Sequence, residues 1–555
     1  MRFMGNIGRK LLILGLAGMT LTMNASMVKA GGDQAQPRNL AAGLKYTLSE
    51  NPEDSYPDRN YGLTDGVYDP TLTYTDPAWQ GHLRGKVREV VFDLGELKSV
   101  SEVKAHFMQH SEFGIFYPNT VSMYVSMDGK QWGTLANVNT KIPIWEQGPA
   151  TDQFYQWTGK TDGVPSGGNT NAVMAQARYV KVTFVAGTFA FLDEIEVWGV
   201  DGKANNSAKI PVDEPAYAGA TGGISNLALL YNGWYDHGEG DWTKEKIIPY
   251  ISYVDTNGQP KDWLYDGVLY LGLYGDHWSG NYGTGTATLA DWKWYLDKTF
   301  APEGDLKQLD EATKETAAKL GDPKHKTKVV LMIPHPGETL SDFGDVDGDG
   351  ISENMVSAEV GKEAALANRE KAVKWYMNEL RQRWSSAGYS HLELTGMYWL
   401  AESVGDEDDR SLVQYASQLV HKEKKRFYWI PYFYGNQNYA GKQLGFDVAS
   451  LQPNYFFDEM PADRIETAAT LAKQYHMGME MEFDERMNTD PTFRQKYIEY
   501  LNGGIDYGYM KNAFKAYYQG NTALFDSAKS QDPAVRELYD FMYQFVKGTY
   551  VKQTP

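Results

Sequence analysis

Two glutamates in the C-terminal half follow runs that have the composition of buried strands. Glu402 follows the apolar run 396–401, and Glu482 ends the run 478–482, which also contains Glu480. Buried strands are normally apolar throughout, so an acid at the end of one is solvated, paired or chemically active. Cleavage of an acetal needs one carboxylic acid to protonate the leaving oxygen and one carboxylate to attack carbon or activate water. Glu402 and Glu482 therefore predict hydrolysis of a glycosidic bond.

The alternation of side chains along a strand places Glu480 and Glu482 on one face, and it places Tyr398 and Glu402 together on another. Glu480 lies one layer deeper, so it is both the alternative catalytic acid and the more natural structural one. Neighbouring aromatic residues such as Trp399 would help to keep one glutamate protonated by limiting its solvation. The competing interpretation is that these acids are ion-paired with Arg or Lys inside the fold.

Other strand ends in this half carry aromatic rings beside amide, imidazole or carboxylate groups. Such a mixture is typical of a saccharide cleft, although each residue alone is as readily structural. No Ser-His-Asp elbow, P-loop or His-Glu-x-x-His motif is present, which disfavours acyl transfer, nucleotide hydrolysis and zinc proteolysis. The expected substrate-binding residues are Tyr231, Asn232, Trp234, Asp276, His277, Trp278, His335, Trp399, Tyr432, Tyr434, Asn436 and Asn454.

A run of alternating acids after the apolar run 328–333, the third expected strand, predicts a calcium site. Oxygen ligands at positions 1, 3 and 5, a glycine at 6 and a backbone carbonyl at 7 form a cage that suits Ca²⁺. Position 12 of an EF-hand has no carboxylate here, so Glu353 must close the site directly or through water. The alternative is a solvated acidic loop. The expected ligands are Asp345, Asp347, Asp349, Ile351 through its carbonyl, and Glu353.

The elements that must position these residues alternate between strand-like and helical runs from residue 223 to 550. This pattern favours a (β/α)₈ barrel over an open doubly wound sheet, and no glycine-rich dinucleotide motif follows the first strand. Catalytic groups of such barrels lie at the C-terminal ends of strands, so Glu402 on the fourth and Glu482 on the seventh would share one mouth. The expected strands are 227–232, 267–274, 328–333, 394–400, 427–433, 448–455, 478–483 and one within 507–519.

The N-terminal part has three expected segments. Residues 1–30 have the pattern of a secretory signal, with Arg9 and Lys10 before an apolar stretch and a small-residue cleavage site at Ala30. About 13 apolar residues are too few to cross a hydrocarbon core of about 30 Å, which disfavours a membrane anchor. Short alternating strands and turns over 35–200 predict an antiparallel β-sandwich, and the polar segment 201–222 predicts a linker.

The composition agrees with an exported two-domain protein. The chain has 555 residues, of which 42% are apolar, and its formal net charge is −19. That charge disfavours binding to nucleic acid or to anionic membranes. The chain has no cysteine, so burial and metal ions must replace disulfides after export. Its 15 Trp and 38 Tyr provide ample ring surface for stacking on sugars.

The placement of the two glutamates resembles that in the clan of retaining barrel glycosidases, in which the acid/base follows strand four and the nucleophile ends strand seven. The resemblance implies that Glu402 is the acid/base and Glu482 the nucleophile. The clan usually has Asn immediately before the acid/base, whereas this chain has Ala401. As a whole, the region 226–550 resembles a family of bacterial extracellular barrel domains described as a domain of unknown function, which implies architecture and no substrate.

The N-terminal segment resembles the discoidin or coagulation-factor type C fold, which is common as a sugar-binding module on bacterial glycosidases. The resemblance rests on the motifs at 39–40, 63–66, 92–95, 125–132, 178–182 and 194–198. It implies a structural calcium ion held near Asp65 and Glu194. Many such modules bind no sugar.

Together these observations predict a secreted retaining glycoside hydrolase that acts on a polysaccharide, with calcium and without an organic cofactor. A monomer is the default expectation. Two alternatives from other classes remain: a carbohydrate-binding protein without catalysis, and a polysaccharide lyase, which needs a Tyr, His or Lys base beside a neutralised uronate.

Overall fold

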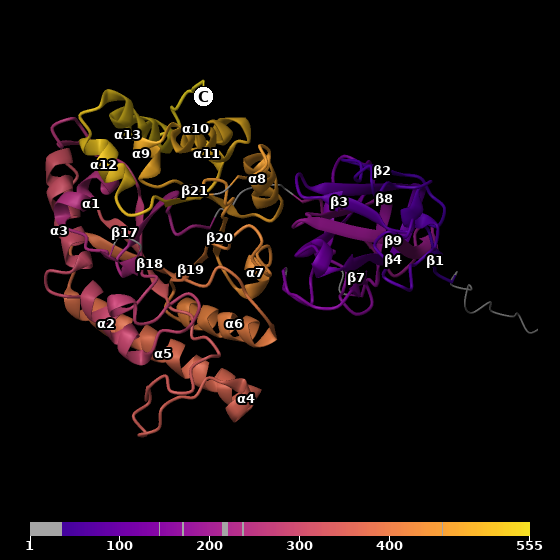
Figure 1. Cartoon of the computed structure of the whole chain (residues 1–555), viewed down its shortest axis with the longest axis horizontal. Coiled ribbons are helices and arrows are strands. Elements are labelled where there is room, and N and C mark those ends of the chain that lie inside the picture. The colour runs from indigo at the N-terminus through magenta and orange to yellow at the C-terminus, as the bar shows by residue number, and fades with distance from the viewer. Residues whose placement is uncertain are drawn as a thin grey trace, which may run out of the picture. The chain divides into compact units, whose positions relative to one another are not determined.

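A computed structural model describes residues 36–143, 145–168, 171–213, 220–235, 238–457 and 459–554. The described chain has an N-terminal β region and a C-terminal α/β region, drawn in indigo to magenta and in magenta to yellow (Figure 1). The predicted secretory signal over 1–30 lies outside the described residues. Among the helices described, none is long and apolar enough to span a membrane.

The N-terminal region is a single, strongly bent β-sheet of antiparallel pairs with one parallel edge. The order of its main path is β1-β9-β4-β8-β5-β6. Its strands are β1 (Arg38–Asn39), β2 (Tyr46–Leu48), β3 (Gln80–Leu83), β4 (Arg88–Gln109), β5 (Thr120–Ser126), β6 (Gly133–Asn139), β7 (Thr151–Thr158), β8 (Met174–Phe184), β9 (Phe189–Asp201) and β10 (Ser207–Lys209).

The long strand β4 joins the two halves of this sheet. Its first part pairs with β8, for example Val90 with Val182, and its second part pairs with β9, for example Val103 with Val197. All four of these valines are buried in one apolar cluster. The predicted antiparallel architecture is therefore confirmed.

The predicted linker over 201–222 begins too early. Strand β9 continues to Asp201, and β10 pairs in parallel with β8, with Ser207 opposite Met174. Ala208 and Ile210 are buried. The apolar side chains in this polar stretch therefore draw its first half into the sheet.

The C-terminal region is a closed barrel of eight parallel strands. Strand β22 closes it against β11, where Ala516 lies opposite Leu227. Each strand falls within or beside one of the eight predicted runs, so the barrel prediction is confirmed. The strands are β11 (Asn226–Tyr231), β16 (Gly267–Leu271), β17 (Thr327–Ile333), β18 (Leu392–Trp399), β19 (Arg426–Trp429), β20 (Val448–Leu451), β21 (Gly478–Glu482) and β22 (Lys515–Tyr518).

Three strands end several residues before their predicted limits, namely β16 at Leu271, β19 and β20. β19 ends at Trp429 and β20 at Leu451, although apolar and aromatic residues continue for several positions. Pro431 and Pro453 follow within two residues of each end. Since proline has no backbone N–H, it cannot donate to the ladder of a central strand.

Helices surround the strands in Figure 1. α5 ends at Ala387, and Gly388 follows it in the left-handed region at φ 61°. The helices are α1 (Lys244–Ile251), α2 (Leu289–Thr299), α3 (Asp305–Leu320), α4 (Ser357–Val360), α5 (Lys362–Ala387), α6 (Glu407–Lys422), α7 (Gly441–Leu444), α8 (Arg464–Gln474), α9 (Arg486–Thr489), α10 (Pro491–Asp506), α11 (Tyr509–Asn512), α12 (Ala523–Lys529) and α13 (Pro533–Val546). Two small hairpins are formed by β12 (Trp234–Tyr235) with β13 (Gly238–Glu239), and by β14 (Ser252–Val254) with β15 (Pro260–Trp263).

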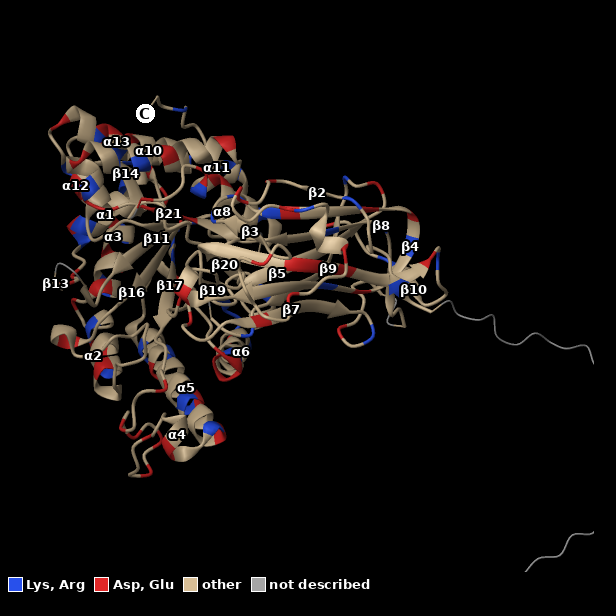
Figure 2. Ribbon diagram, turned by 45° about the vertical axis from the view of Figure 1, so that its right-hand side comes forward, with Lys and Arg blue, Asp and Glu red and all other residues tan. Residues whose placement is uncertain are grey.

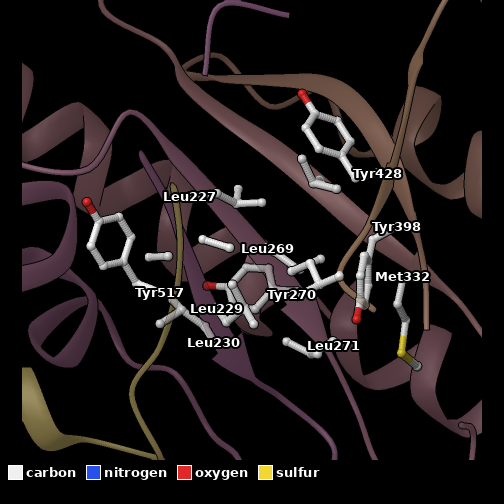
Figure 3. Packing of buried hydrophobic residues seen from close by; sticks show 14 of the residues in the cluster. Leu227, Leu229, Leu230, Leu269, Tyr270, Leu271, Met332, Tyr398, Tyr428 and Tyr517 are labelled. Carbon is white, nitrogen blue, oxygen red and sulfur yellow. The ribbon is translucent and has the colours of Figure 1, made fainter. Parts of the chain in front are cut away.

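Aliphatic and tyrosine side chains pack between the barrel strands. Figure 3 shows Leu229 near Leu269, and Tyr398 beside Met332. This close packing fixes the rotation of each strand about its own axis. As a consequence, the polar residues at the strand ends face a common space.

The close approach of β18 to β19 at Gly396 provides a test of the barrel. A Cβ atom on Gly396 would lie 2.4 Å from the backbone oxygen of Arg426 and from Cε2 of Tyr428. We expect Gly396→Ala to lower the free energy of unfolding by about 1–3 kcal/mol, measured by urea denaturation. Gly283→Ala is the control, since its new Cβ would meet only Asn281 Oδ1 at 3.5 Å. Equal stability of the two variants would contradict the packing described for this strand pair.

Candidate active site

A cavity of about 520 Å³ opens at the C-terminal end of the barrel strands. It is lined by acids, amides, aromatic rings and small aliphatic groups, and none of its described lining residues is basic. Glu402, Glu480 and Glu482 all face it. The full lining is Leu229, Tyr231, Tyr235, Leu271, Leu273, Tyr274, Gly283, Thr284, Tyr398, Leu400, Ala401, Glu402, Gln452, Phe457, Glu480, Glu482 and Tyr518.

The side chain of Glu482 is deeply buried and held by neutral donors. Only 1% of the residue is exposed. Its Oε1 accepts a hydrogen bond from Asn454 Nδ2 at 3.2 Å, and its Oε2 accepts from the Tyr455 backbone N–H at 3.2 Å and from the Tyr500 hydroxyl. Burial raises the pKa of Glu482, the hydrogen bonds from Tyr500 and Tyr455 lower it, and the charge of Glu402 raises it.

Glu402 lies in the loop after β18 and is solvent-exposed within the cavity. Its position among the strand ends removes most of its bulk hydration, which raises the pKa of its carboxyl, while the Gln452 side chain lowers that pKa by hydrogen bonding. Gln452 is itself fixed by donating to the Ile430 carbonyl at 2.9 Å. Glu402 is thus the acid most accessible to a bound molecule.

Glu480 is a third carboxyl on the cavity wall and only 3% of it is exposed. Among the described residues, no hydrogen bond or ion pair reaches its side chain. Burial raises its pKa well above the ordinary value, and the charges of Glu482 and Glu402 raise it further. A group in this state holds its proton near neutrality unless a ligand stabilises the anion.

Within the described part of the chain, no Lys or Arg is ion-paired with any of these three acids. The interpretation of Glu402 and Glu482 as members of structural ion pairs is therefore wrong for the residues described. Three carboxyls that share one cavity without a cation must titrate over a wide pH range, because the ionisation of each opposes that of the others.

One side of the cavity is built from aromatic rings. Tyr231 stacks on Tyr235 with ring centroids 4.4 Å apart and an angle of 8°, and Tyr518 meets Tyr231 edge-on at 5.8 Å. The hydroxyls of Tyr235 and Tyr518 are hydrogen-bonded to each other. Phe457 lies against Tyr518 at 5.4 Å. Such a wall provides flat apolar faces and hydroxyl edges to a ring-shaped ligand.

Three of the predicted substrate-binding residues belong to this cavity or contact its acids. Tyr231 lines it, and Asn454 donates to Glu482. Tyr432 follows β19, and its backbone N–H donates to the Glu402 carbonyl at 3.3 Å. After burial, the charge of Glu402 is the next largest cause that raises the pKa of Tyr432.

Four predicted residues form a cluster beside the cavity wall. Trp234 lies 4.7 Å from His277 and 6.1 Å from Trp278, ring to ring, and Trp278 lies 4.9 Å from the cavity residue Tyr274. The Oδ1 atom of Asp276 is hydrogen-bonded to Nδ1 of His277 at 2.6 Å. His277 and Trp278 both have positive φ, at 50° and 66°, which is a strained conformation for side-chain-bearing residues.

Asn232 is buried and does not face the cavity. Its Nδ2 donates to Thr299 Oγ1 at 3.0 Å and to Asp305 Oδ2 at 3.1 Å, and its Oδ1 accepts from Tyr295 at 2.7 Å. The alternation after Tyr231 turns this side chain outward to the helices. Its role is therefore structural.

His335 and Trp399 also do not line the cavity. His335 Nε2 lies 3.3 Å from Asp409 Oδ1 and 3.2 Å from Arg369 Nη2, and Arg369 pairs with Asp409. Trp399 is buried and packs edge-on against His335. Both belong to the layer between strands and helices.

Tyr434 and Asn436 support loops of the barrel mouth. Tyr434 accepts a hydrogen bond from Arg464 Nη2 at 2.9 Å. Asn436 Nδ2 donates to the carbonyls of Val404 at 2.9 Å and Gly405 at 2.7 Å. Asn436 therefore fixes the loop that carries Glu402.

The sequence prediction missed several residues that build the cavity. Tyr518 ends the eighth strand, so the strand-end rule could have found it. Tyr500 comes from the middle of α10, where no local pattern indicates contact with a strand end. The missed residues are Tyr235, Tyr274, Tyr455, Phe457, Tyr500 and Tyr518.

The acidic loop before α4 is visible as red segments in Figure 2. Carboxylate oxygens of Asp345, Asp347 and Asp349 lie within 4.8 Å of one another. Glu353 accepts from the Val346 backbone N–H at 3.0 Å, and Lys371 approaches Asp347 at 2.8 Å and Glu353 at 3.4 Å. The three aspartates fit a cation, while Lys371 neutralises part of the charge on one side. Ile351 is exposed beside them.

The second predicted metal position has a more specific feature. Glu194 is 1% exposed, its Oε2 accepts from the Gly66 backbone N–H at 3.1 Å, and its Oε1 is buried without a hydrogen-bond partner. Burial raises the pKa of Glu194 to about 8, and Asp65 adds to this rise. A cation between Asp65 and Glu194 would satisfy the orphaned oxygen.

Fold and site together define a (β/α)₈-barrel protein with a carboxyl-lined cavity at the C-terminal end of the barrel strands. The chain belongs to the family described as Domain of unknown function (DUF4855), whose model matches residues 226–544. No curated protein matches the chain.

The solved structures that are similar to the N-terminal region include carbohydrate-binding modules. Chitosan-binding module 1 from a Paenibacillus sp. IK-5 chitosanase/glucanase is 19% identical and covers 29% of this chain and 99% of that one, with a TM-score of 0.19. A Streptococcus pneumoniae fucose-binding module is 13% identical and covers 30% and 99%, with a TM-score of 0.21. A Clostridium perfringens module in complex with GalNAc-β-1,3-galactose is 13% identical and covers 28% and 94%, with a TM-score of 0.19.

The unpaired state of Glu480 predicts a pH-dependent stability. Since its pKa is raised on folding, the chain keeps full stability below the unfolded value near 4.5 and loses it as the pH rises toward the folded value. Glu480→Gln removes this loss, which amounts to at most about 1.4 kcal/mol for each pH unit between the two values. We expect the variant to gain stability relative to wild type between pH 4.5 and 7.5 in urea denaturation.

The control for this measurement is Glu393→Gln. Glu393 is exposed on β18, and its replacement changes the net charge equally. The free energy of unfolding of Glu393→Gln should equal that of wild type at pH 4.5 and at pH 7.5. A Glu480→Gln curve that also runs parallel to wild type would contradict the burial argument.

Proposed function

We propose that this chain is a secreted glycoside hydrolase that cleaves a polysaccharide through Glu402 and Glu482. The carrying observation is that two carboxyls, from the ends of the fourth and seventh barrel strands, face one cavity and have no cation partner among the described residues. An aromatic wall beside them supports a sugar as the ligand.

The different surroundings of the two acids support different roles. Glu482 receives three hydrogen bonds, which favour its carboxylate and orient it as the nucleophile. Glu402 has a raised pKa and faces solvent in the cavity, which suits a proton donor. These assignments also follow from the resemblance to retaining barrel glycosidases.

The proposed reaction has two steps. Glu402 gives its proton to the glycosidic oxygen while Glu482 attacks the anomeric carbon, so that the leaving sugar departs and a glycosyl ester forms on Glu482. A water molecule then gives a proton to Glu402 and its oxygen to the anomeric carbon, and the carboxylate of Glu482 leaves. The original configuration is restored after two inversions.

The composition of the cavity disfavours a polysaccharide lyase. A lyase must neutralise a uronate, and the described lining residues include no Lys, Arg or His. A carbohydrate-binding barrel without catalysis is the remaining alternative. In that case the carboxyls of Glu402 and Glu482 would contribute only to affinity.

The remaining parts of the proposal concern accessory features. The N-terminal region would act as a sugar-binding module, with calcium near Asp65 and Glu194. A second calcium ion would order the acidic loop at Asp345. The partner is a polysaccharide, the chain acts as a monomer, and no organic cofactor takes part.

Substitution of the two glutamates tests the mechanism. We expect Glu402→Gln and Glu482→Gln each to reduce release of reducing ends by about 10³-fold or more, because each removes one half of the acid and nucleophile pair. The assay is a screen of purified glycans, followed by ¹H NMR of the first product, which should retain the configuration of the substrate.

A substrate with a good leaving group separates the two roles. A dinitrophenyl glycoside of the cleaved sugar needs no protonation, so Glu402→Gln should keep much of its glycosylation rate while Glu482→Gln stays inactive. Folding of both variants is checked by circular dichroism. Full activity of either folded variant on polysaccharide would reject the proposed mechanism. Absence of activity in the wild-type chain on every glycan would instead favour a carbohydrate-binding protein without catalysis.

Calcium removal tests the two proposed metal positions. We expect chelation with EGTA to lower the melting temperature. A free calcium concentration of about 100 times the dissociation constant stabilises the folded state by about 2.7 kcal/mol, and chelation removes this contribution. Titration calorimetry should find two ions in wild type and one in each of Glu194→Gln and Asp345→Asn. An unchanged number of ions in both variants would place calcium elsewhere.

A further inference from the structure

We infer that the barrel cavity binds a glycan with free amino groups, and that Glu480 is the counter-ion of a sugar ammonium group. This inference rests on the proposed function for its catalytic part and goes beyond it in naming the substrate class. The cavity combines an unpaired, buried carboxyl at Glu480 with the absence of any basic residue among its described lining.

Glu480 has no other assigned task. The proposed hydrolysis uses Glu402 and Glu482, and Glu480 lies on the same strand as Glu482, two residues earlier. A carboxyl that is 97% buried normally has a partner, because an unpaired one loses its hydration without compensation. Since it faces the cavity, a bound molecule can supply that partner.

The charge of the surroundings selects the kind of partner. A uronate or sulfate would meet Glu402, Glu480 and Glu482 with no lysine or arginine in the described lining to neutralise it, and close contact between like charges is unfavourable. A neutral hydroxyl would hydrogen-bond to Glu480 but leave the repulsion between the acids. A protonated amine both donates hydrogen bonds and lowers that repulsion.

A second cavity extends the acidic surface from the first. It has a volume of about 380 Å³ and shares Tyr231 with the main cavity. Glu239, Asp241 and Glu485 line it against Lys246, so its formal charge is negative. Burial and the charge of Asp241 raise the pKa of Glu239. A cationic polymer would find complementary charge along this path.

Binding measurements test the inference without requiring turnover. Tetrasaccharides of glucosamine and of N-acetylglucosamine are titrated into Glu402→Gln at about pH 6 by calorimetry, at low and high salt. We expect the free-amine form to bind at least about tenfold more tightly, with an advantage that shrinks as salt rises. A tetragalacturonate serves as the anionic comparison and should bind least.

Addition of Glu480→Gln to this variant should remove most of the preference for the free amine. Addition of Glu393→Gln, which changes the same charge on an exposed strand position, should leave the preference intact. A preference that survives Glu480→Gln undiminished overturns the role of Glu480. Equal or tighter binding of the N-acetylated or anionic sugar overturns the substrate class.

Hydrolysis assays separate this inference from the proposed function. The wild-type chain is given polymers of glucosamine and galactosamine, in free-amine form and after N-acetylation, together with polygalacturonate. Cleavage of the N-acetylated or anionic polymers in preference to free-amine ones rejects the inference and keeps the hydrolase. Preferred binding of free amines without cleavage of any polymer rejects the hydrolase and keeps the inference. If Glu480→Gln does not fold, the sugar preference of the Glu402→Gln chain and its salt dependence decide.

Discussion

The site depends on carboxyl groups in a barrel mouth whose described lining contains no Lys, Arg or His. Burial of an unpaired acid is unfavourable, and the mutual repulsion of Glu402, Glu480 and Glu482 adds to this. The apolar core below them, with residues such as Leu229 and Leu269, must offset that cost. Stability given up at one end of a fold in this way is characteristic of sites that bind or react.

Neighbouring strands position the acids. The segment after β20 supplies Asn454 and Tyr455, which hold Glu482 at the end of the adjacent β21. The segment after β19 supplies Asn436, which holds the loop after the adjacent β18 and so fixes the surroundings of Glu402. The prolines that end β19 and β20 release these segments from the ladder. The early ends of β19 and β20 therefore help to position the acids of the site.

The sequence was sufficient to predict the eight strands and the meeting of Glu402 with Glu482, because both depend on local periodicity and on the parallel order of the strands. The sequence-based prediction failed where the direction of a single side chain, or a contact between distant elements, decides which residues line the cavity. Asn232 directly follows the cavity residue Tyr231, yet alternation turns it toward the helices. Tyr500 reaches Glu482 from α10, a contact that only tertiary packing creates. The linker prediction failed because two apolar residues within a polar stretch are enough to extend a sheet.

The residue before Glu402 connects the proposed mechanism with the proposed class of substrate. In retaining barrel glycosidases an amide side chain usually precedes the acid/base. In this chain Ala401 precedes Glu402 and lines the cavity, and its carbonyl accepts from Trp429 Nε1 at 2.7 Å. The side chains left to bind a polar substituent of the sugar then include Gln452 and Glu480. Gln452 is committed to Ile430 and Glu402, while Glu480 has no protein partner among the described residues. In the proposed complex, the carboxylate of Glu480 would favour a cationic substituent over a hydroxyl, because a hydrogen bond between two opposite charges is stronger than one to a neutral group.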